Sequence, residues 1–262
     1  MVMEEARKGK ALLQVWVEDS PFDPRKHFDP AGVMVCWHDR YILGDVHGYS
    51  DPSDFLLGLV TTHNVDGLYE WAENQVLMEQ RGDEWAVFLK ECPEESYLHE
   101  TKDEAEYDRS IWIDQIVSGD DRNIELSPDL LWGLLPDDLT ILPLYLYDHG
   151  GLSMNTEGFS CPWDSGQVGY IYMTAETAKR EGITDPEKYL RGEVKEYDSY
   201  LRGEVYGFTL METHTCSECG SLKPETLDTA GGFYGYESLI ESLKSYLPNE
   251  YVSLVDELDP VY

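Results

Sequence analysis

The excess of acidic residues is the feature that most limits how this chain can fold. The sequence contains 52 Asp and Glu residues against 19 Lys and Arg residues, a formal net charge of −33 over 262 residues. Repulsion between so many like charges opposes a compact state. The chain nevertheless has 42% hydrophobic and 12% aromatic residues, whereas acidic disordered segments are poor in aromatics. We therefore expect a folded protein whose surface carries the surplus carboxylates.

The charge also limits the partners. Direct binding of nucleic acid is disfavoured, because affinity for phosphates comes from Lys and Arg side chains. Three explanations of the acidic surface remain: adaptation to high salt, binding of cations, and binding of a basic partner. The acids are clustered, for example in residues 91–108 and 184–198, and Tyr residues lie among them. This clustering favours a surface that competes with nucleic acid for a basic groove.

The sequence predicts a cytoplasmic protein that does not enter a membrane. No apolar run approaches the roughly 18 residues that suggest a transmembrane helix. Residues 1–17 also lack the apolar core of a signal peptide. The five Cys residues are an odd number in a chain of this length, which argues against a disulfide framework.

Hydrophobic periodicity predicts a mixture of strands and helices. Strands are expected at residues 11–19, 33–43, 139–147, 168–173 and 205–212, with a meander of adjacent strands between 139 and 173. Helices are expected at residues 53–64, 65–82, 103–119, 174–182, 185–204 and 236–248, and Tyr107 is expected to face the core. No linker divides the chain. We predict a mixed α/β (α+β) fold over residues 1–262, a single domain with a central, mostly antiparallel sheet flanked by helices.

The segment Gly-Asp-Val-His-Gly at residues 44–48 follows an apolar run and resembles the first motif of calcineurin-like metallophosphoesterases. The resemblance implies that Asp45 and His47 bind metal, with His149 as a candidate further ligand. Two adjacent metal ions need a bridging carboxylate and several more imidazole or amide ligands. The later motifs are missing from this sequence, which favours an ordinary strand end followed by a turn.

Two cysteine-containing segments are further candidate sites. Cys216 and Cys219, with His214, have the spacing of ligands for a structural zinc ion, and Cys161 or His149 would have to complete a tetrahedral site. Cys161, His149 and Asp164 are also the residue types of a cysteine nucleophile with its base. An ordinary loop is the simpler reading of residues 148–164.

The central segment LYLYDHGGLSMNTEGFSCPWDSGQVGYIYMT resembles a family of acidic proteins from bacterial phages, plasmids and integrative elements. VCWHDRYILGD before it and EVKEYDSYLRGEVYGF after it extend the resemblance to residues 33–240. The resemblance brings no established activity. It implies a mobile-element context, in which small acidic proteins often neutralise host defence systems.

We therefore predict a non-enzymatic protein that mimics nucleic acid and blocks a basic, nucleic-acid-binding host defence protein, as antirestriction and anti-CRISPR proteins do. It would act in the cytoplasm of the host bacterium without a cofactor other than the candidate zinc. The alternative is a metal-dependent hydrolase that uses Asp45 and His47. The predicted partner-binding residues are Glu94, Glu95, Tyr97, Glu104, Asp108, Asp120, Asp121, Glu193 and Glu196.

Overall fold

The computed structural model describes residues 1–119 and 126–261. The chain forms two compact units. Unit 1 contains Met1–Val46 and Thr140–Tyr262, and unit 2 contains His47–Leu139. Unit 2 is thus inserted between two segments of unit 1, and each is described by itself. That both belong to one domain stays a prediction.

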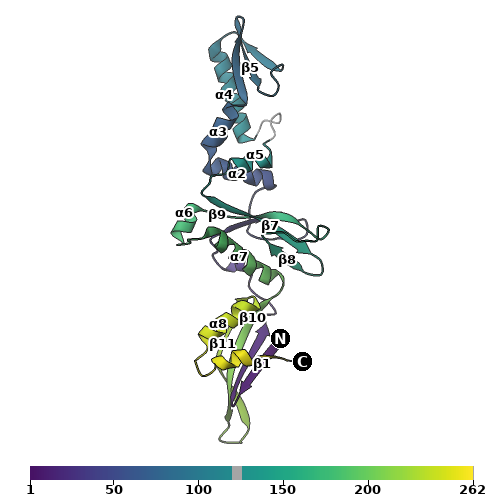
Figure 1. Cartoon of the computed structure of the whole chain (residues 1–262), viewed down its shortest axis with the longest axis vertical. Helices are drawn as coiled ribbons and strands as arrows, with labels where there is room; N and C mark the ends of the chain where they lie inside the picture. Colours follow the sequence, from purple (N-terminus) through teal and green to yellow (C-terminus); the bar gives the residue numbers. More distant parts are fainter. Residues whose placement is uncertain (120–125, 262) are drawn as a thin grey trace. The chain divides into compact units, whose positions relative to one another are not determined.

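The first sheet of unit 1 has five strands in the order β11-β10-β2-β1-β12 (Figure 1). Their bounds are β1 (Val2–Lys8), β2 (Ala11–Val17), β10 (Val205–Thr215), β11 (Leu222–Tyr234) and β12 (Asp259–Pro260). All four neighbouring pairs are antiparallel. Leu13, Phe208 and Leu210 are buried against the helix α8 (Tyr236–Tyr246) and the 3₁₀ helix η1 (Val252–Glu257). One face of this sheet therefore packs against α8 and η1 and forms part of the hydrophobic core.

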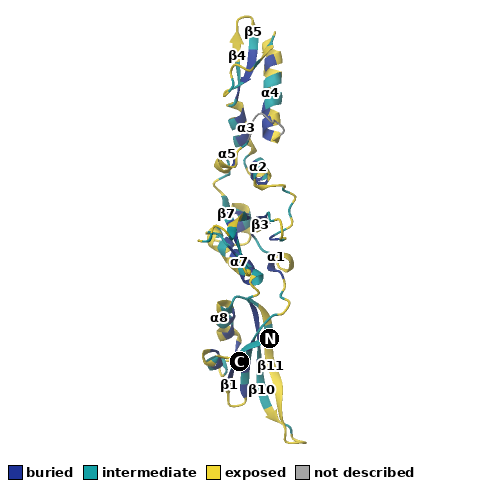
Figure 2. Ribbon diagram, turned by 90° about the vertical axis from the view of Figure 1, so that its right-hand side faces the viewer, coloured by how far each residue is buried: buried dark blue, intermediate teal, exposed yellow. Residues whose placement is uncertain are grey.

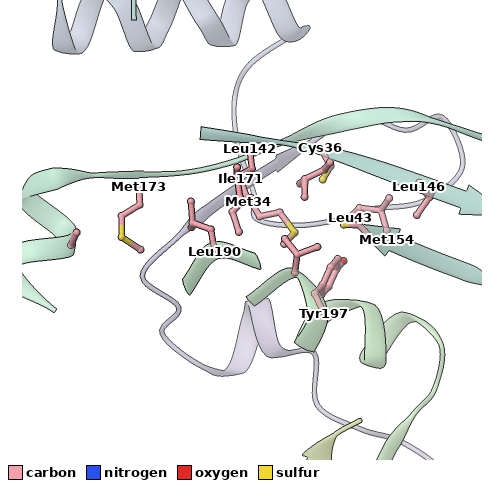
Figure 3. Close-up of a cluster of buried hydrophobic side chains, with 13 residues drawn as sticks. Met34, Cys36, Leu43, Leu142, Leu146, Met154, Ile171, Met173, Leu190 and Tyr197 are labelled. Atoms are coloured by element: carbon pink, nitrogen blue, oxygen red, sulfur yellow. The ribbon is translucent and has the colours of Figure 1, made fainter. Parts of the chain in front are cut away.

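The second sheet of unit 1 has the strand order β3-β9-β7-β8. The bounds are β3 (Val33–Cys36), β7 (Leu139–Asp148), β8 (Leu152–Asn155) and β9 (Ser165–Thr174), with helices α1 (Pro24–His27), α6 (Ala175–Arg180) and α7 (Pro186–Leu201). Figure 3 shows Met34, Ile171, Leu190 and Tyr197 converging between the strands and α7. Asp185 caps α7 and Pro186 occupies its first turn, both favourable at a helix N-terminus.

Unit 2 combines a three-stranded sheet of order β4-β5-β6 with four helices among the residues that are described. The elements are α2 (Pro52–His63), α3 (Val65–Glu73), β4 (Val76–Arg81), β5 (Glu84–Leu89), β6 (Ser96–His99), α4 (Lys102–Ser118) and α5 (Pro128–Gly133). The helix α4 lies along the sheet (Figure 1) and buries Ala105, Ile113 and Ile116. The ring of Trp112 also meets Tyr97 of β6 edge to face, with 5.2 Å between ring centroids.

The predicted mixed α+β class with mostly antiparallel strand pairing is confirmed. The described residues form three sheets where one central sheet was expected, and three local predictions were wrong. The helix expected at 65–82 ends at Glu73, and residues 76–82 form β4 and the start of the loop in the β4–β5 hairpin. Gly82 has a φ of +70° in the two-residue hairpin loop, a conformation that glycine adopts without steric cost. The expected meander is replaced by an order in which β7 lies between β8 and β9. Tyr107 is 69% exposed.

In the described part of the chain, no helix is both long and apolar enough to cross a membrane.

Candidate functional site

The predicted partner-binding residues of unit 2 fall in one stretch, residues 91–108, which we call the acidic segment. It contains eight Asp and Glu residues and a single Lys. Glu94 and Glu95 lie exposed in the loop between β5 and β6, and Glu104 lies exposed in the first turn of α4. Asp108 is half-buried, and its carboxylate contacts His99 Nε2 at 3.1 Å. Asp120 and Asp121 lie outside the described residues.

Further exposed acids of the same segment were missing from the predicted set, namely Glu91, Glu100, Asp103 and Glu106. These four acids could have been added to the predicted set, because they lie in the same acidic run of the sequence as the residues that were chosen. Lys102 is the only basic side chain of the segment apart from His99, and it contacts Glu106 at 2.6 Å. The hydrogen bond to Glu106 and then its charge raise the pKa of Lys102. One carboxylate is thus locally compensated.

Two acids also have a structural role at the start of α4. Thr101 caps the helix by accepting a hydrogen bond from the Glu104 amide at 3.3 Å. Asp103 and Glu104 lie in the first turn, where the positive end of the helix dipole favours negative charge. Helix stability therefore explains part of the acidity here, but not the acids of the preceding loop.

Apolar side chains are exposed among these acids. Tyr97 is 61% exposed although its ring contacts Trp112, and the adjacent Leu98 is also exposed. Tyr107 adds a second exposed aromatic ring on α4. The acidic segment therefore combines carboxylates with apolar surface that can pack against a partner.

Unit 2 as a whole is the more densely charged unit. By sequence it holds 23 of the 52 Asp and Glu residues but only 5 of the 19 Lys and Arg residues, a formal net charge of −18 over 93 residues. Unit 1 has 29 acidic and 14 basic residues, which gives −15 over 169 residues. Some of the few cations of unit 2 are used internally, since the Arg109 guanidinium donates hydrogen bonds to the carbonyls of Glu73 and Val76.

Asp45, the proposed metal ligand of the hydrolase alternative, is committed to a buried ion pair. Arg25, whose side chain is 2% exposed, donates to both Asp45 oxygens at 2.9 and 2.6 Å. The Met34 amide donates to the same carboxylate at 2.8 Å. Burial alone would lower the pKa of Arg25, but its hydrogen bonds to Asp45, with the charges of Asp45 and Glu193, outweigh this and raise it.

Gly44 explains why a glycine precedes Asp45. Its φ is +68°, and an added Cβ would lie 2.7 Å from the Met34 carbonyl oxygen. The Asp45 amide donates to the same oxygen at 2.8 Å, so the turn closes directly on β3. The Gly-Asp-Val-His-Gly segment thus begins with a tight structural turn, and Asp45 lies in unit 1 whereas His47 begins unit 2. These contacts favour the turn interpretation over the two-metal site.

The two predicted partner-binding residues of α7 differ from each other. The Glu193 carboxylate accepts from Arg25 at 2.7 Å and from the Gly32 amide at 3.1 Å, and its side chain is almost buried. It belongs to the Arg25 network and not to an open surface, because it balances the buried guanidinium. Glu196 is exposed, and partial burial of its carboxyl followed by the charge of Glu193 raises its pKa.

The loops of residues 148–164 do bring Cys161, His149 and Asp164 together. The Asp164 carboxylate lies between the other two, 3.5 Å from His149 Nδ1 and 3.5 Å from the Cys161 sulfur. A nucleophilic cysteine is activated by an imidazole or another positive group, whereas a neighbouring carboxylate disfavours the thiolate. Asp148 next to them pairs with Arg40. The side chain in contact with the Cys161 sulfur is therefore a carboxylate.

His214, Cys216 and Cys219 lie at the far end of the β10–β11 hairpin. The His214 imidazole contacts Glu225 at 3.2 Å and Glu212 at 3.7 Å. Hydrogen bonds from Ser221 first, and then from Cys216, lower the pKa of Cys219. Within residues 1–119 and 126–261, the structure shows no group of three or more His, Cys, Asp or Glu side chains placed to hold a metal ion. The zinc site that Cys161 or His149 would complete stays a prediction.

Comparisons with protein-family models, with curated proteins and with solved structures found no match.

Proposed function

We propose that this protein is a non-enzymatic inhibitor that presents the acidic segment of unit 2 in place of nucleic acid. Its target would be a basic, nucleic-acid-binding protein of bacterial defence, such as a restriction enzyme or a CRISPR effector. It would act in the cytoplasm of a bacterium that carries the mobile element. The observation that carries the proposal is the largely uncompensated charge of residues 91–108, where seven of the eight acids are exposed.

The charge density of this segment supports the proposal. A helix rises about 1.5 Å per residue, so the four acids between positions 103 and 108 lie within about 8 Å along the axis of α4. This is one carboxylate per about 2 Å, whereas duplex DNA carries one charge per about 1.7 Å. Lys102 offsets one of them, and the loop acids Glu94 and Glu95 add to the rest. A groove that binds phosphates would attract this surface.

The exposed apolar side chains support binding to a protein in particular. Charges steer association and fix orientation, but affinity at protein interfaces depends on a few packed anchors, among which Tyr is enriched. Tyr97 and Leu98 are exposed within the acidic segment. We propose that Tyr97 packs against the target while the surrounding carboxylates pair with Lys and Arg residues that otherwise bind phosphates.

The test is capture of targets from bacterial lysate by the immobilised full chain, followed by competition with duplex DNA. The test variant replaces Glu94, Glu95, Glu104 and Glu106 by Gln. The matched control replaces Glu176, Glu218, Glu241 and Glu250, four exposed acids of unit 1, and thus changes the net charge equally. We expect the test variant to bind the captured target about tenfold to a hundredfold more weakly, and the control to bind almost as the unchanged chain does.

Salt provides the second measurement. The binding should weaken between about 0.1 M and about 1 M salt, as the Debye length falls from about 10 Å to about 3 Å. Duplex DNA should displace the protein from its target. If duplex DNA does not displace the protein from its target, nucleic-acid mimicry is contradicted. If the two four-residue variants lose equal affinity for the target, mimicry by the acidic segment is contradicted as well.

A further inference from the structure

We propose that the turn containing Cys216 and Cys219 is half of a zinc site, and that a second copy of this chain supplies the other half. The site would hold one Zn²⁺ between four thiolates, two from each chain. It makes no use of unit 2 and is independent of the proposed inhibition.

The turn holds its two cysteines close together. The Cys216 amide donates to the Ser221 carbonyl at 2.8 Å, and the Gly220 amide donates to the Cys216 carbonyl at 2.9 Å. These bonds close the chain on itself between β10 and β11. The Cys219 sulfur lies 3.0 Å from Ser221 Oγ and within hydrogen-bonding reach of the Cys216 side chain. Both thiols can therefore bind one metal ion.

One chain supplies too few ligands for a closed structural site, which for zinc is tetrahedral with four N or S ligands. His214 is engaged with Glu225 and Glu212. No third His, Cys, Asp or Glu of the described residues joins the two thiols in a metal-binding group. Two copies of the turn, placed tip to tip, provide four sulfur ligands.

The hairpin end is free to meet another chain within its own sheet. The neighbouring strand β2 pairs with β10 only as far as Glu212, opposite Ala11. Beyond Glu212, β10 pairs only with β11, as far as the pair of Thr215 and Leu222. Figure 2 shows β11 exposed along most of its length. Leu222, directly beside the turn, is 71% exposed, and it would be covered by the second copy.

The tip is also where two copies of such an acidic chain can approach. Residues 213–224 contain one acid, Glu218, and one base, Lys223, and the flanking Glu212 and Glu225 both contact His214, so this end of the hairpin carries few acids in a chain of net charge −33. On binding, the four thiols release their protons to solvent, and the Zn²⁺ with four thiolates carries a charge of −2. Lys223 of each chain lies opposite His214 in the hairpin register and would bring one positive charge per chain to this end of the hairpin.

The experiment uses the full chain, reduced, stripped of metal and then supplied with Zn²⁺ alone. Native mass spectrometry and elemental analysis should find a dimer with one zinc per two chains, which a chelator converts to metal-free monomers. Cys216→Ser and Cys219→Ser should each abolish both the zinc and the dimer. Cys161→Ser is the matched control, because that thiol lies outside the hairpin, and it should retain both. Leu222→Glu keeps the thiols and should weaken the dimer.

One zinc per monomeric chain would overturn the proposal, because the chain would then complete the site itself. Failure of the unchanged chain to retain zinc would overturn it as well, as would a zinc-loaded dimer that survives both cysteine substitutions. Circular dichroism of each variant separates these outcomes from misfolding, and the Leu222→Glu dimer equilibrium tests the contact without removing a ligand.

Discussion

Unit 1 and unit 2 use their carboxylates differently. In unit 1, Asp45 and Glu193 surround the buried Arg25, and Asp198 accepts hydrogen bonds from Ser153 Oγ and the Met154 amide at 2.8 and 2.7 Å. In unit 2 most of the acids of residues 91–108 point to solvent. These three carboxylates of unit 1 hold partners within the fold, although many other acids of unit 1 are exposed. Most carboxylates of the acidic segment lack such partners, and we propose that they are available for binding.

The largest expected effect is the loss of Arg25. Arg25→Met leaves two carboxylates in a largely buried place without their cation, and breaking a buried ion pair in this way costs about 3–5 kcal/mol. The free energy of unfolding from urea titration measures the loss. The matched control is Lys195→Met, because the exposed Lys195–Glu237 pair contributes at most about 1 kcal/mol. If both variants lose a similar free energy of unfolding, the distinction between buried structural charges and surface charges in unit 1 would fail.

A smaller loss is expected for the hydroxyl of Tyr197. This side chain is 2% exposed, and its oxygen accepts a hydrogen bond from the Gly44 amide at 3.0 Å. Tyr197→Phe keeps the ring and leaves the amide without its acceptor, which costs about 1–3 kcal/mol. Burial raises the pKa of Tyr197 to about 12, so the hydroxyl is neutral at ordinary pH. Tyr200→Phe, on the same helix but half-buried, is the control and should change the unfolding free energy less.

Helix starts and strand alternation were the parts of the fold that the sequence could predict. Thr174 and Asp185 cap the helices that were expected at 174–182 and 185–204, and such a cap depends on a few adjacent residues. The Arg25 network could not be predicted, since Glu193 is 168 residues away from Arg25 in the chain. The error at residues 76–82 has a local cause, because a short apolar run suits a helix or a strand equally.

The candidate site follows the same rule. The acids of residues 91–108 were predictable because they are consecutive in sequence, and their exposure follows from local polarity. The exposure of Tyr107 was not predictable, since helical periodicity places it near the core-facing positions and only the position of the sheet decides which residues are covered. Glu193 was wrongly assigned to the binding surface, because the sequence does not show that it pairs with the buried Arg25.

Glu196 should give a pH-dependent effect of less than about 1 kcal/mol, since the residue is exposed and solvent screens its charge. Its pKa is raised in the folded state, so the folded chain binds the proton more tightly than the unfolded chain does. The stability contributed by this group is therefore present at low pH and falls as the pH rises from about 4.5 through the raised pKa. Glu196→Gln should gain stability over wild type above that range and lose the advantage below it, in urea titrations at several pH values.

The smallest expected effect on stability belongs to the acidic segment itself. Glu94→Gln and Glu95→Gln should each change the free energy of unfolding by no more than about 0.5 kcal/mol, because neither residue is buried. The change should be a gain at low salt, since each substitution removes repulsion within a unit of formal charge −18. Urea titrations at about 0.05 M and about 1 M salt measure it, and the gain should shrink as the shorter Debye length screens the repulsion. A clear loss of stability at low salt would mean that these carboxylates support the fold, and the functional contrast between the two units would then fail at the residues where it is strongest.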